Sequence, residues 1–497
     1  MSTLGTRSVD AILWGGAGTV ARLAVQLVTQ IVLARTLGPE QYGLFAIGAI
    51  VVSFSNFFAD FGIAYGLIQQ KELGDCDVRF VVAWQWIVGG VVTGAIVAGS
   101  GAIAAFFGQE KARALVQVLA WVCLVNALAA PSLNLLKRAL DFRHLQIAQF
   151  FGYVVGYVVV GIPLAMAGWQ VWALVCAWIV QSLVVLLVAY AKVRHPLRPL
   201  WWHPQAWETL RYGLTVLGTN LVNWMIGNID KVAVGRTFAP RETGLYTTAY
   251  NLLYNPTSAL LGAVQPVLLS SAAKVENDPA RIARGYEALV GGIALCVLPG
   301  FVALAAVAPT LVLALYGMAW APMGDFIPPL ALTMPVFLLW GLTTPLLWAC
   351  VSVTRELRVQ LPVAMLWVVC ASLAATISAV CVAWTVLALF LLRFAVVFAS
   401  VQGALGLSWR RLAAVCRGGI AVSIILAAAL WGWDTVWTPW ISAPLARLAL
   451  DMGFGAMLYL VLLSLPGIVT GPARAALGTV VRRAPRPVAR ALTWLTR

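Results

Sequence analysis

Long apolar runs, separated by short polar connections, make up almost the whole chain. Gly, Pro and charged residues mark off the runs. A helix of about 20 residues crosses the hydrocarbon core of a bilayer, so each run predicts one membrane-spanning helix. The pattern predicts about fourteen spans, and the weakest division between them lies near residues 380–385. The spans are expected near residues 11–35, 43–68, 80–107, 114–136, 146–167, 170–191, 208–238, 244–272, 286–314, 326–351, 359–380, 384–406, 412–433 and 444–468.

Composition agrees with a chain that is dissolved in lipid. Hydrophobic residues make up 62% of the 497 positions and charged residues only 10%, and the mean hydropathy is +0.90. A soluble domain carries charge at about a quarter of its positions. The predicted fold class is therefore an all-α membrane protein, and the short connections leave no room for a separate soluble domain.

The basic residues lie mainly on one side of the predicted spans. Of the 33 Lys and Arg residues, 24 fall in the even-numbered connections and the two ends of the chain, and six fall in the odd-numbered connections. Cytoplasmic loops carry an excess of Lys and Arg, so we expect both termini to be cytoplasmic. This bias also explains most of the formal charge of +15, as a topology signal and an attraction to anionic membrane lipids. Nucleic-acid binding is not expected.

The chain contains an internal repeat. Residues 35–45, after the first span, align without a gap with residues 236–246, after the seventh span, at a shift of 201 positions. Arg, Thr, Pro, Gly and Leu recur at matching positions. Because six helices separate the copies, both run in the same direction, which predicts two six-helix lobes related by a pseudo-two-fold axis along the membrane normal. The expected division is 1–200 and 201–407 for the lobes, 408–470 for two further helices, and 471–497 for a basic cytoplasmic tail.

Polar side chains at membrane depth concentrate on spans one, two, seven and eight. Turning by about 100° per residue, each of these helices places its polar residues on one arc. Corresponding pairs of helices in the two lobes therefore predict a shared central cavity, which would be the substrate path. The residues expected to contact substrate there are Arg22, Gln26, Gln30, Asn56, Asn220, Asn223, Lys231, Tyr250, Asn251 and Tyr254.

The charged residues on these faces suggest specific roles. Arg22 lies about 17 Å into its span, near the midplane, where a guanidinium suits a diphosphate in charge and geometry. A structural ion pair with Asp60 is the alternative. Asp60 and Asp230 are candidates for coupling transport to an ion gradient or for ion pairs, and the side chain of Asp230 should diverge from that of Lys231. Arg393 stands alone on span twelve, where packing against a neighbouring helix is favoured over a substrate role.

The residue types that would indicate catalysis or a metal site do not form such patterns. The eight cysteines lie mostly inside apolar runs and form no C-x-x-C pair, and the three histidines fall in polar connections. No phosphate-binding G-x-x-x-x-G-K-[ST] loop occurs. We therefore expect no catalytic residue, no metal and no cofactor, and a transporter rather than an enzyme.

Three segments resemble a known family of transporters. Residues 35–44 read R-x-L-G-P-x-x-Y-G-L, residues 60–71 read D-x-G-x(4)-L-I-Q-x-K, and residues 244–252 read G-x-Y-x-x-A-Y-N-L. These patterns resemble the polysaccharide-transporter (Wzx-type) flippases of the multidrug, oligosaccharidyl-lipid and polysaccharide (MOP) exporter superfamily. None of the patterns carries a catalytic residue, so the candidate site residues rest on the polar faces alone.

The resemblance implies a function. It predicts that two six-helix lobes form a V whose cleft opens alternately to either side, so that an undecaprenyl-diphosphate-linked oligosaccharide is flipped from the cytoplasmic to the periplasmic leaflet for exopolysaccharide, capsule or O-antigen synthesis. It also implies a bacterial cytoplasmic (inner) membrane location, H⁺ or Na⁺ as coupling ion, membrane lipids as partners, and the polymerase and chain-length machinery as further candidate partners. The alternatives are a cation-coupled multidrug exporter of the same superfamily, and a membrane glycosyltransferase, polymerase or ligase that uses the same lipid carrier.

Overall fold

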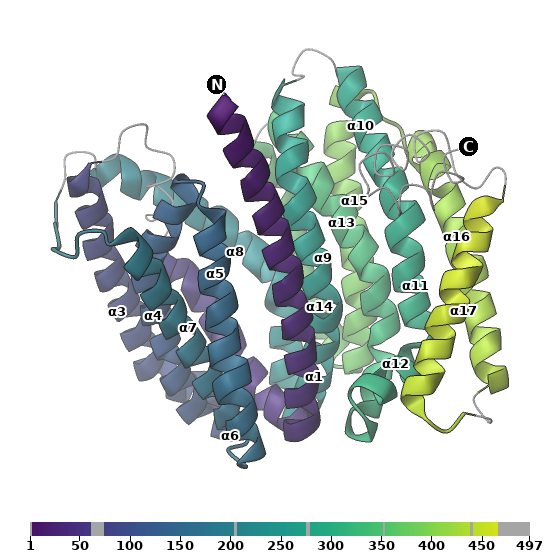
Figure 1. The fold of residues 1–497 in the computed structure, drawn as a ribbon, viewed down its shortest axis with the longest axis horizontal. Helices are drawn as coiled ribbons and strands as arrows, with labels where there is room; N and C mark the ends of the chain where they lie inside the picture. Colours follow the sequence, from purple (N-terminus) through teal and green to yellow (C-terminus); the bar gives the residue numbers. More distant parts are fainter. Residues whose placement is uncertain are drawn as a thin grey trace. The chain divides into compact units, whose positions relative to one another are not determined.

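The described part of the chain consists of helices and the turns between them in the computed structural model (Figure 1). The structure describes residues 2–60, 74–202, 206–274, 279–350, 353–437 and 441–465. Within those ranges there is no β-strand. The structure therefore confirms the all-α class that the apolar pattern predicts.

The helices fall into two sets along the chain. The first set is α1 (Ser2–Asp60), α3 (Asp75–Phe106), α4 (Lys111–Arg138), α5 (Phe142–Tyr153), η1 (Val154–Gly161), α6 (Ile162–Met166), α7 (Val171–Val193) and α8 (Ala206–Thr237). The second set is α9 (Pro240–Lys274), α10 (Pro279–Gly292), η2 (Ile293–Val297), α11 (Leu298–Ala306), α12 (Ala308–Leu315), η3 (Met318–Asp325), α13 (Ile327–Cys350), α14 (Val353–Ala375), α15 (Ala379–Leu405), α16 (Trp409–Trp437) and α17 (Pro444–Ser464).

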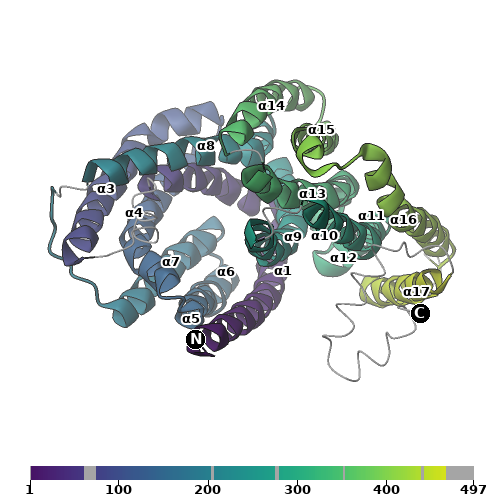
Figure 2. The same ribbon diagram turned by 90° about the horizontal axis from the view of Figure 1, so that it is seen from above.

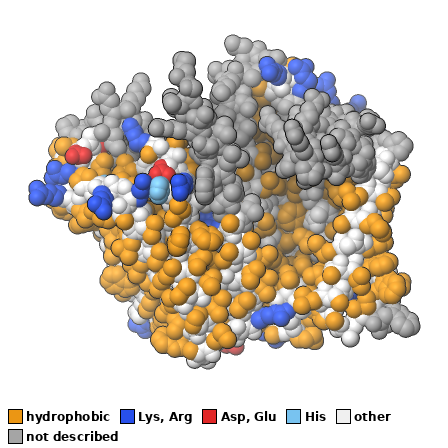
Figure 3. Space-filling model, viewed as in Figure 1, with side chains coloured by type: hydrophobic (Ala, Val, Ile, Leu, Met, Phe, Trp, Pro, Cys, Tyr) orange, Lys and Arg blue, Asp and Glu red, His pale blue; other side chains and the backbone are white. Residues whose placement is uncertain are grey.

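Eleven helical segments of the described chain are long and apolar enough to cross a membrane, by length and composition. They are Ala21–Ser55, Asp75–Phe106, Lys111–Arg138, Phe142–Met166, Val171–Val193, Pro279–Ala306, Ile327–Trp348, Arg355–Ala375, Ala379–Leu405, Trp409–Trp437 and Pro444–Ser464. Helices α8 and α9 are not among them, and both carry polar faces that the sequence predicts. Figure 3 shows hydrophobic side chains over the middle of one face, with Lys and Arg mainly toward its two ends. The protein is thus a multi-pass membrane protein.

Helix α1 contains a sharp kink that separates two helical segments. Gly38 has φ 75° and ψ 171°, in the region that favours glycine, and Pro39 follows it. Proline cannot donate the backbone hydrogen bond that would continue the first segment, so the chain turns and a second segment begins. The sequence predicts a break between residues 35 and 43, and the structure has it at Gly38.

The chain divides into two compact units, Met1–Thr248 and Ala249–Arg497. In the first unit, buried Leu119 and Cys123 of α4 belong to one apolar cluster with Val52 of α1 and Val175 of α7. In the second unit, Trp320 and Trp367 are fully buried, and α16 lies beside α17 at one edge of the unit (Figure 2). The predicted division of the chain into lobes at residue 200 stays a prediction.

Two π-helical segments precede prolines. Segment η1 ends just before Pro163, at the second residue of α6, and η2 ends just before Pro299, at the second residue of α11. A proline inside a helix clashes with the carbonyl one turn earlier, and a wider turn relieves that clash. The wider turn keeps the helix continuous across each proline, so Phe142–Met166 and Pro279–Ala306 are both long enough to span a bilayer.

In the first unit, the connections that are even-numbered in the predicted order of spans meet at one end of the helices. Arg79, at the start of α3, donates from Nε to the carbonyl oxygen of Arg198 at 3.0 Å, and its own carbonyl oxygen accepts from the backbone nitrogen of Leu200 at 3.3 Å. His195 lies with its Nε2 3.0 Å from the hydroxyl oxygen of Ser132, near the end of α4. These contacts tie the segment after α7 to the ends of α3 and α4.

The connections that are odd-numbered in the predicted order of spans meet at the opposite end of the helices of this unit. Gln41, after the kink of α1, accepts a hydrogen bond from the backbone nitrogen of Val171 at 3.2 Å. The guanidinium of Arg236, at the end of α8, lies 4.4 Å from the ring centre of Phe106, at the end of α3. Even- and odd-numbered connections therefore lie at opposite ends, as alternating membrane crossings require.

Candidate functional site

Arg22 lies on the first segment of α1, facing α5. Its side chain is half-buried, and its guanidinium donates a hydrogen bond to the side-chain oxygen of Gln149. This described partner is a neutral amide, so the hydrogen bond does not neutralise the positive charge of Arg22. A guanidinium has five N–H donors, more than one amide oxygen can use. The charge and the number of donors of Arg22 therefore suit the binding of an anionic ligand.

The other predicted residues of this face follow Arg22 along α1, and Gln26 contacts α5. Gln26 and Gln30 are half-buried. The hydroxyl of Tyr153, the last residue of α5, donates to the carbonyl oxygen of Gln26 at 3.4 Å, and its ring stacks on Tyr157 with 4.8 Å between ring centres. The polar face of α1 thus lies against α5. The apolar pattern of the sequence does not indicate that α5 contributes residues to the candidate site.

Helix α8 holds a second group of predicted site residues. Lys231 is 8% exposed, and its ammonium donates to the carbonyl oxygen of Gly227 at 2.5 Å and to the side-chain oxygen of Asn228 at 3.4 Å. Both of these acceptors are neutral and belong to α8 itself. Asn223, two turns earlier, is half-buried. Oxygens of its own helix thus supply part of the surroundings of the buried Lys231 ammonium.

Asp230, next to Lys231, points to different partners. It is 2% exposed, and its Oδ2 accepts a hydrogen bond from the hydroxyl of Tyr246 in α9 at 2.6 Å. Its Oδ1 is buried and has no hydrogen-bond donor among the residues that the structure describes. Burying an ionised carboxylate is costly unless it is fully hydrogen-bonded. This carboxylate is therefore suited to binding or releasing a cation.

An aromatic contact fixes α8 against the second segment of α1. The indole nitrogen of Trp224 donates to the hydroxyl of Ser53 at 3.0 Å, and the Trp224 ring lies 4.7 Å from that of Phe54 between centres. Ser53 belongs to the polar stripe predicted for the second span, and Trp224 follows Asn223. The structure therefore places Ser53, of the stripe predicted for the second span, beside α8, which carries the stripe predicted for the seventh.

Three predicted site residues cannot be placed in this way. The side chains of Asn56, Asp60 and Asn220 lie outside the described part of the structure. The predicted alternative in which Arg22 pairs with Asp60 therefore stays a prediction, as does the role of Asp60 in ion coupling.

The second unit contains the predicted aromatic residues. Tyr250 is buried and stacks on Tyr254, with 5.2 Å between ring centres, and Tyr254 lies edge-on to Phe337 at 5.3 Å. Asn251, between the two tyrosines, is exposed. The structure thus joins Tyr250 and Tyr254 into one aromatic cluster, whereas Asn251 points elsewhere.

Arg393, on α15, is the centre of a buried network. Its guanidinium donates to the side-chain oxygen of Gln360, and its central carbon lies 3.5 Å from the ring centre of Trp340. The amide of Gln360 donates in turn to Glu356, which also accepts from the indole of Trp348 at 2.5 Å. Arg393 and Glu356 are 3% and 2% exposed. The expected packing of Arg393 against neighbouring helices is thus observed.

Sequence reasoning did not single out Glu356 or Gln360. The two residues are one helical turn apart near the start of α14, and a carboxylate followed four residues later by an amide is a signal for a shared helix face. It also missed Arg447 of α17 as a partner of Asp434 of α16, whose ion pair spans 2.5 Å. The signal there was an acidic residue just after one apolar run and a basic residue near the start of the next.

Two groups outside the spans have shifted pKa values. Partial burial lowers the pKa of His195 from its ordinary 6.5, against a smaller opposite effect of its contact with the carbonyl of Pro196. For Asp141, burial raises the pKa, but hydrogen bonds from the side chain and backbone of His144 outweigh burial and the pKa is lowered overall. Both lie at the end where the predicted even-numbered connections meet.

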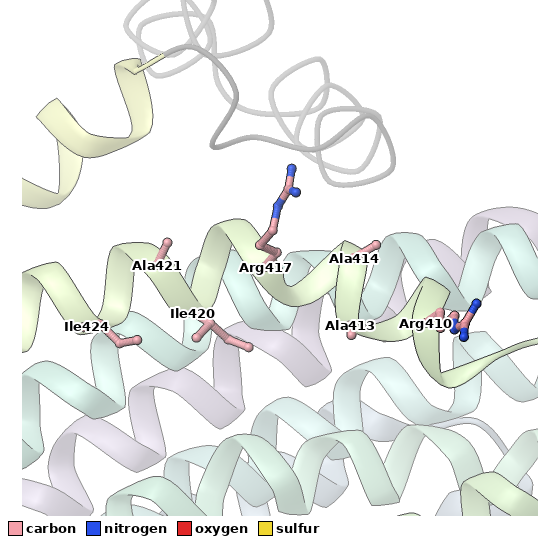
Figure 4. A pocket seen from close by; sticks show the side chains of 7 residues that line it. All are labelled: Arg410, Ala413, Ala414, Arg417, Ile420, Ala421 and Ile424. Atoms are coloured by element: carbon pink, nitrogen blue, oxygen red, sulfur yellow. The ribbon is translucent and has the colours of Figure 1, made fainter.

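An open pocket of about 630 Å³ runs along the N-terminal half of α16 (Figure 4). Its described lining combines two basic side chains with small and branched apolar ones, Arg410, Ala413, Ala414, Arg417, Ile420, Ala421 and Ile424. None of the predicted site residues lines it. Within the described part of the chain, no group of three or more His, Cys, Asp or Glu side chains could hold a metal ion.

A comparison with known families places this chain in one of them. A family described as polysaccharide biosynthesis protein matches residues 32–325, which is more than half of the sequence. The matched region begins in the first segment of α1 and ends in η3. It therefore contains Lys231, Asp230 and both copies of the internal repeat.

Several curated proteins are similar over most of the chain. The lipopolysaccharide biosynthesis protein WzxC of Escherichia coli (strain K12) is 23% identical over 352 residues, which cover 69% of this chain and 70% of WzxC. The succinoglycan biosynthesis transport protein ExoT of Rhizobium meliloti (strain 1021) is 22% identical over 316 residues, 64% of this chain and 63% of ExoT.

Two solved structures share the fold. The lipid II flippase MurJ in an inward closed conformation superposes with a TM-score of 0.71 and 10% identity, over 93% of this chain and 98% of MurJ. An inward-facing multidrug resistance MATE family transporter of the MOP superfamily superposes with a TM-score of 0.55 and 14% identity, over 80% of this chain and 99% of that one. At these identities the likeness concerns the fold.

Proposed function

Because this chain belongs to the polysaccharide biosynthesis protein family, we propose that it is a flippase that moves an undecaprenyl-diphosphate-linked oligosaccharide from the cytoplasmic to the periplasmic leaflet. The relatives include a succinoglycan biosynthesis transport protein, and a lipid II flippase shares the fold. The protein is therefore a transporter and not an enzyme. The observation that carries the proposal is a pair of basic side chains, Arg22 on α1 and Lys231 on α8, that lie within the membrane helices of one unit.

The proposed topology has fourteen membrane helices. The kink at Gly38 divides α1 into two crossings, and α8 and α9 add two crossings that are too polar to be recognised by composition. Polar helices of this kind are expected where a protein lines a water-filled cavity. We propose that twelve helices form two lobes related by an axis along the membrane normal, that α16 and α17 are appended to them, and that both termini face the cytoplasm of a bacterial inner membrane.

The substrate's diphosphate is the chemical group that these cations fit. Arg22 offers a planar guanidinium that can donate two parallel hydrogen bonds to phosphate oxygens, and Lys231 offers a compact positive charge. The amides Gln26, Gln30 and Asn223, with Asn56 and Asn220, would hydrogen-bond sugar hydroxyls. Tyr250 and Tyr254 provide aromatic faces for the sugars, with Asn251 as a further polar contact. Membrane lipids surround the carrier's chain.

Transport against a gradient needs an energy source, and we propose that Asp230 couples it to H⁺ or Na⁺. Its buried Oδ1 has no donor among the described residues, and Tyr246 holds its Oδ2. An ion that binds the two conformations with different affinity shifts the equilibrium between them, which is how coupling works. Asp60 is a second candidate. We also propose that the pathway's polymerase and chain-length machinery receive the flipped unit.

A genetic experiment tests the proposed function. Deleting the gene should trap the lipid-linked repeat unit on the cytoplasmic leaflet and stop polymer export, and the unmodified gene should restore both. Arg22→Ala should restore only a small part of the export although the protein is inserted normally, whereas Gln149→Ala, which removes only the described partner of Arg22, should restore it. Normal polymer in the deletion strain, without a second gene that replaces this one, would refute the proposal.

A further inference from the structure

Helix α17 carries an acidic residue on the face that packs against the rest of the second unit. Asp451 is the eighth residue of α17, and its side chain is 1% exposed. Neither of its two carboxylate oxygens has a hydrogen-bond donor among the described residues. Helix α17 contacts α16 and α12 (Figure 1). Because a buried carboxylate without donors is costly, the ionised form of Asp451 lacks the partners that would stabilise it.

The contact between α16 and α17 is apolar on both sides of Asp451. Leu448 and Phe454, three residues before and after it, pack against a buried cluster that contains Leu430 of α16. The ring of Phe454 also stacks on that of Trp433, with 4.3 Å between ring centres. These contacts place the carboxyl beside hydrocarbon, where its charged form is less stable than in water.

The polar side chains that face Asp451 come from three helices. Asp434 of α16 binds Arg447 of α17, with 2.5 Å between the Asp434 Oδ1 and the guanidinium. Thr310 of α12 donates from Oγ1 to the same Oδ1 at 3.3 Å. Arg447 lies one helical turn before Asp451 on the same face of α17. Among the described residues, the charges that act on Asp451 are those of Asp434 and Arg447.

The two carboxyl groups are in hydrogen-bonding contact with each other. Ionised carboxylates only accept hydrogen bonds, so Asp451 and Asp434 repel each other unless a proton lies between them. Asp434 has the cation of Arg447 beside it, which favours its ionised form. A protonated Asp451 can then donate to Asp434 in a charge-assisted hydrogen bond. One proton therefore supplies the missing donor and reduces the net charge of the three side chains from −1 to zero.

We propose that Asp451 and Asp434 form a proton-binding site, in which one proton carried by Asp451 bridges the two carboxyls and fastens α17 to α16. Only the side of the membrane is taken from the proposed function. The proposed topology places the end of α16 and the start of α17 outside the cytoplasm, so the external pH sets the occupancy of the site. This proton is separate from the proposed coupling ion, because Asp230 belongs to the first compact unit.

Infrared spectroscopy of the purified full-length protein tests for the proton directly. A protonated carboxyl group has a carbonyl stretching band that a carboxylate lacks. Subtracting the spectrum of Asp451→Asn from that of the unmodified protein isolates the band of this residue. The band should be present at about pH 5 and should disappear as the pH rises toward about 9. If the difference spectrum contains no such band at any pH, the proposal is wrong.

Two further variants locate the proton. Asp434→Asn removes the second carboxyl and leaves Asp451 beside Arg447, so the band should be lost at much lower pH. Asp325→Asn removes an exposed carboxyl from η3, which contacts α12, and should leave the band and its pH dependence unchanged. A band that responds equally to both variants would not come from a carboxyl pair.

Arg447 provides a test that a purely structural contact would not pass. Arg447→Gln removes the positive charge that favours ionisation of the pair, so the band should persist to a pH about one unit higher. Loss of the band at the same or a lower pH would contradict a proton shared beside this cation.

Sodium is the other cation that a pair of carboxylates could bind. Replacing sodium chloride by choline chloride at constant ionic strength should leave the band and its pH dependence unchanged. If sodium removes the band at a pH where choline retains it, the pair binds sodium in place of a proton and the proposal is wrong.

Thermal unfolding tests whether the proton fastens α17. The folded protein holds a proton that the unfolded chain releases at the same pH, so the stability that the site contributes falls as the pH rises. In Asp451→Asn an amide N–H replaces the proton as donor. The unfolding temperature of this variant should therefore fall less toward alkaline pH than that of the unmodified protein and of Asp325→Asn. An equal fall in all three would show that the proton does not hold the helices together.

None of these measurements depends on transport, so the two proposals can fail separately. Absence of the band overturns the proton site and leaves the flippase untouched. A protein that shows the band but moves no lipid-linked oligosaccharide keeps the proton site and loses the proposed function.

Discussion

Arg22 and Arg393 are both arginines within apolar helices, but their surroundings differ. Arg393 is 3% exposed, covers the ring of Trp340 and is linked through Gln360 to the carboxylate of Glu356. Arg22 is half-buried, and its described hydrogen-bond partner is the neutral amide of Gln149. The first arginine has its counter-charge built into the fold, whereas the second has a neutral described partner and, under the proposed function, receives its counter-charge from the substrate. The partners of a charged side chain, and not its depth in the membrane, therefore indicate whether it has a structural or a functional role.

The largest expected effect is on stability, in the second unit. Arg393→Met should lower the free energy of unfolding by about 3–5 kcal/mol, because it leaves Glu356 buried without a compensating cation. Thermal unfolding of the purified protein in detergent measures this. The double variant Arg393→Met with Glu356→Gln should recover much of the loss, since it removes both charges. Equal stability of the single variant and the unmodified protein would show that the network is not structural.

The next effect is on transport, in the first unit. Arg22→Ala should slow export about tenfold or more, because a charge-assisted hydrogen bond contributes about 1.5–3 kcal/mol. Its thermal unfolding temperature should stay close to that of the unmodified protein. Arg22→Lys should retain part of the activity, since it keeps the charge and loses the planar fork. An Arg22→Ala protein that exports normally but unfolds early would make Arg22 a structural residue like Arg393.

A smaller effect should follow from the hydroxyl of Tyr246. Tyr246→Phe removes the described donor to Asp230 and should cost about 1–3 kcal/mol in stability if the carboxylate stays charged. Asp230→Asn should restore part of that stability in the double variant, and alone it should remove the dependence of transport on the ion gradient. If Asp230→Asn keeps full gradient dependence, coupling belongs elsewhere, with Asp60 as the next candidate.

The smallest effect concerns pH at the end where the even-numbered connections meet. Burial lowers the pKa of His195 below its ordinary 6.5, so the folded protein favours the neutral imidazole. The stability it contributes is present above pH 6.5 and is lost as the pH falls from there through the lower folded pKa. His195→Gln should flatten unfolding temperature against pH in this window. An unchanged slope would assign the acid sensitivity to another group.

The sequence was sufficient to predict the helical class and the break between the first two spans, because both are local. An apolar run and a Gly-Pro pair act through the backbone of their own segment. The break near residue 380 was placed too late: α14 ends at Ala375, and α15 begins after Ser378, whose side chain accepts from the backbone nitrogen of Cys381 at 3.0 Å. Ser378 is an ordinary helix N-cap, and this local signal was overlooked.

The partners of the charged residues could not be predicted in the same way. Helical periodicity places Arg22 and Gln26 on one face, but it does not show that α5 supplies Gln149 and Tyr153 to that face. Likewise, it places Glu356 and Gln360 together without indicating that Arg393 of α15 reaches them. Such pairings depend on which helices become neighbours, and that depends on the whole fold. The repeat was visible in the sequence, whereas the backbone contact between its copies, at Gly43 and Gly244, was not.

Translocation by the purified protein tests the central claim most directly. The protein is placed in liposomes whose inner and outer leaflets carry an undecaprenyl-diphosphate-linked oligosaccharide, and a membrane-impermeant glycosidase added outside digests the sugars that it can reach. With the unmodified protein, digestion should proceed to completion as sugars from the inner leaflet arrive. With Arg22→Ala it should pause after the outer leaflet and continue about ten times more slowly. If the unmodified protein also stops at the outer leaflet, this chain is not a flippase of such lipids.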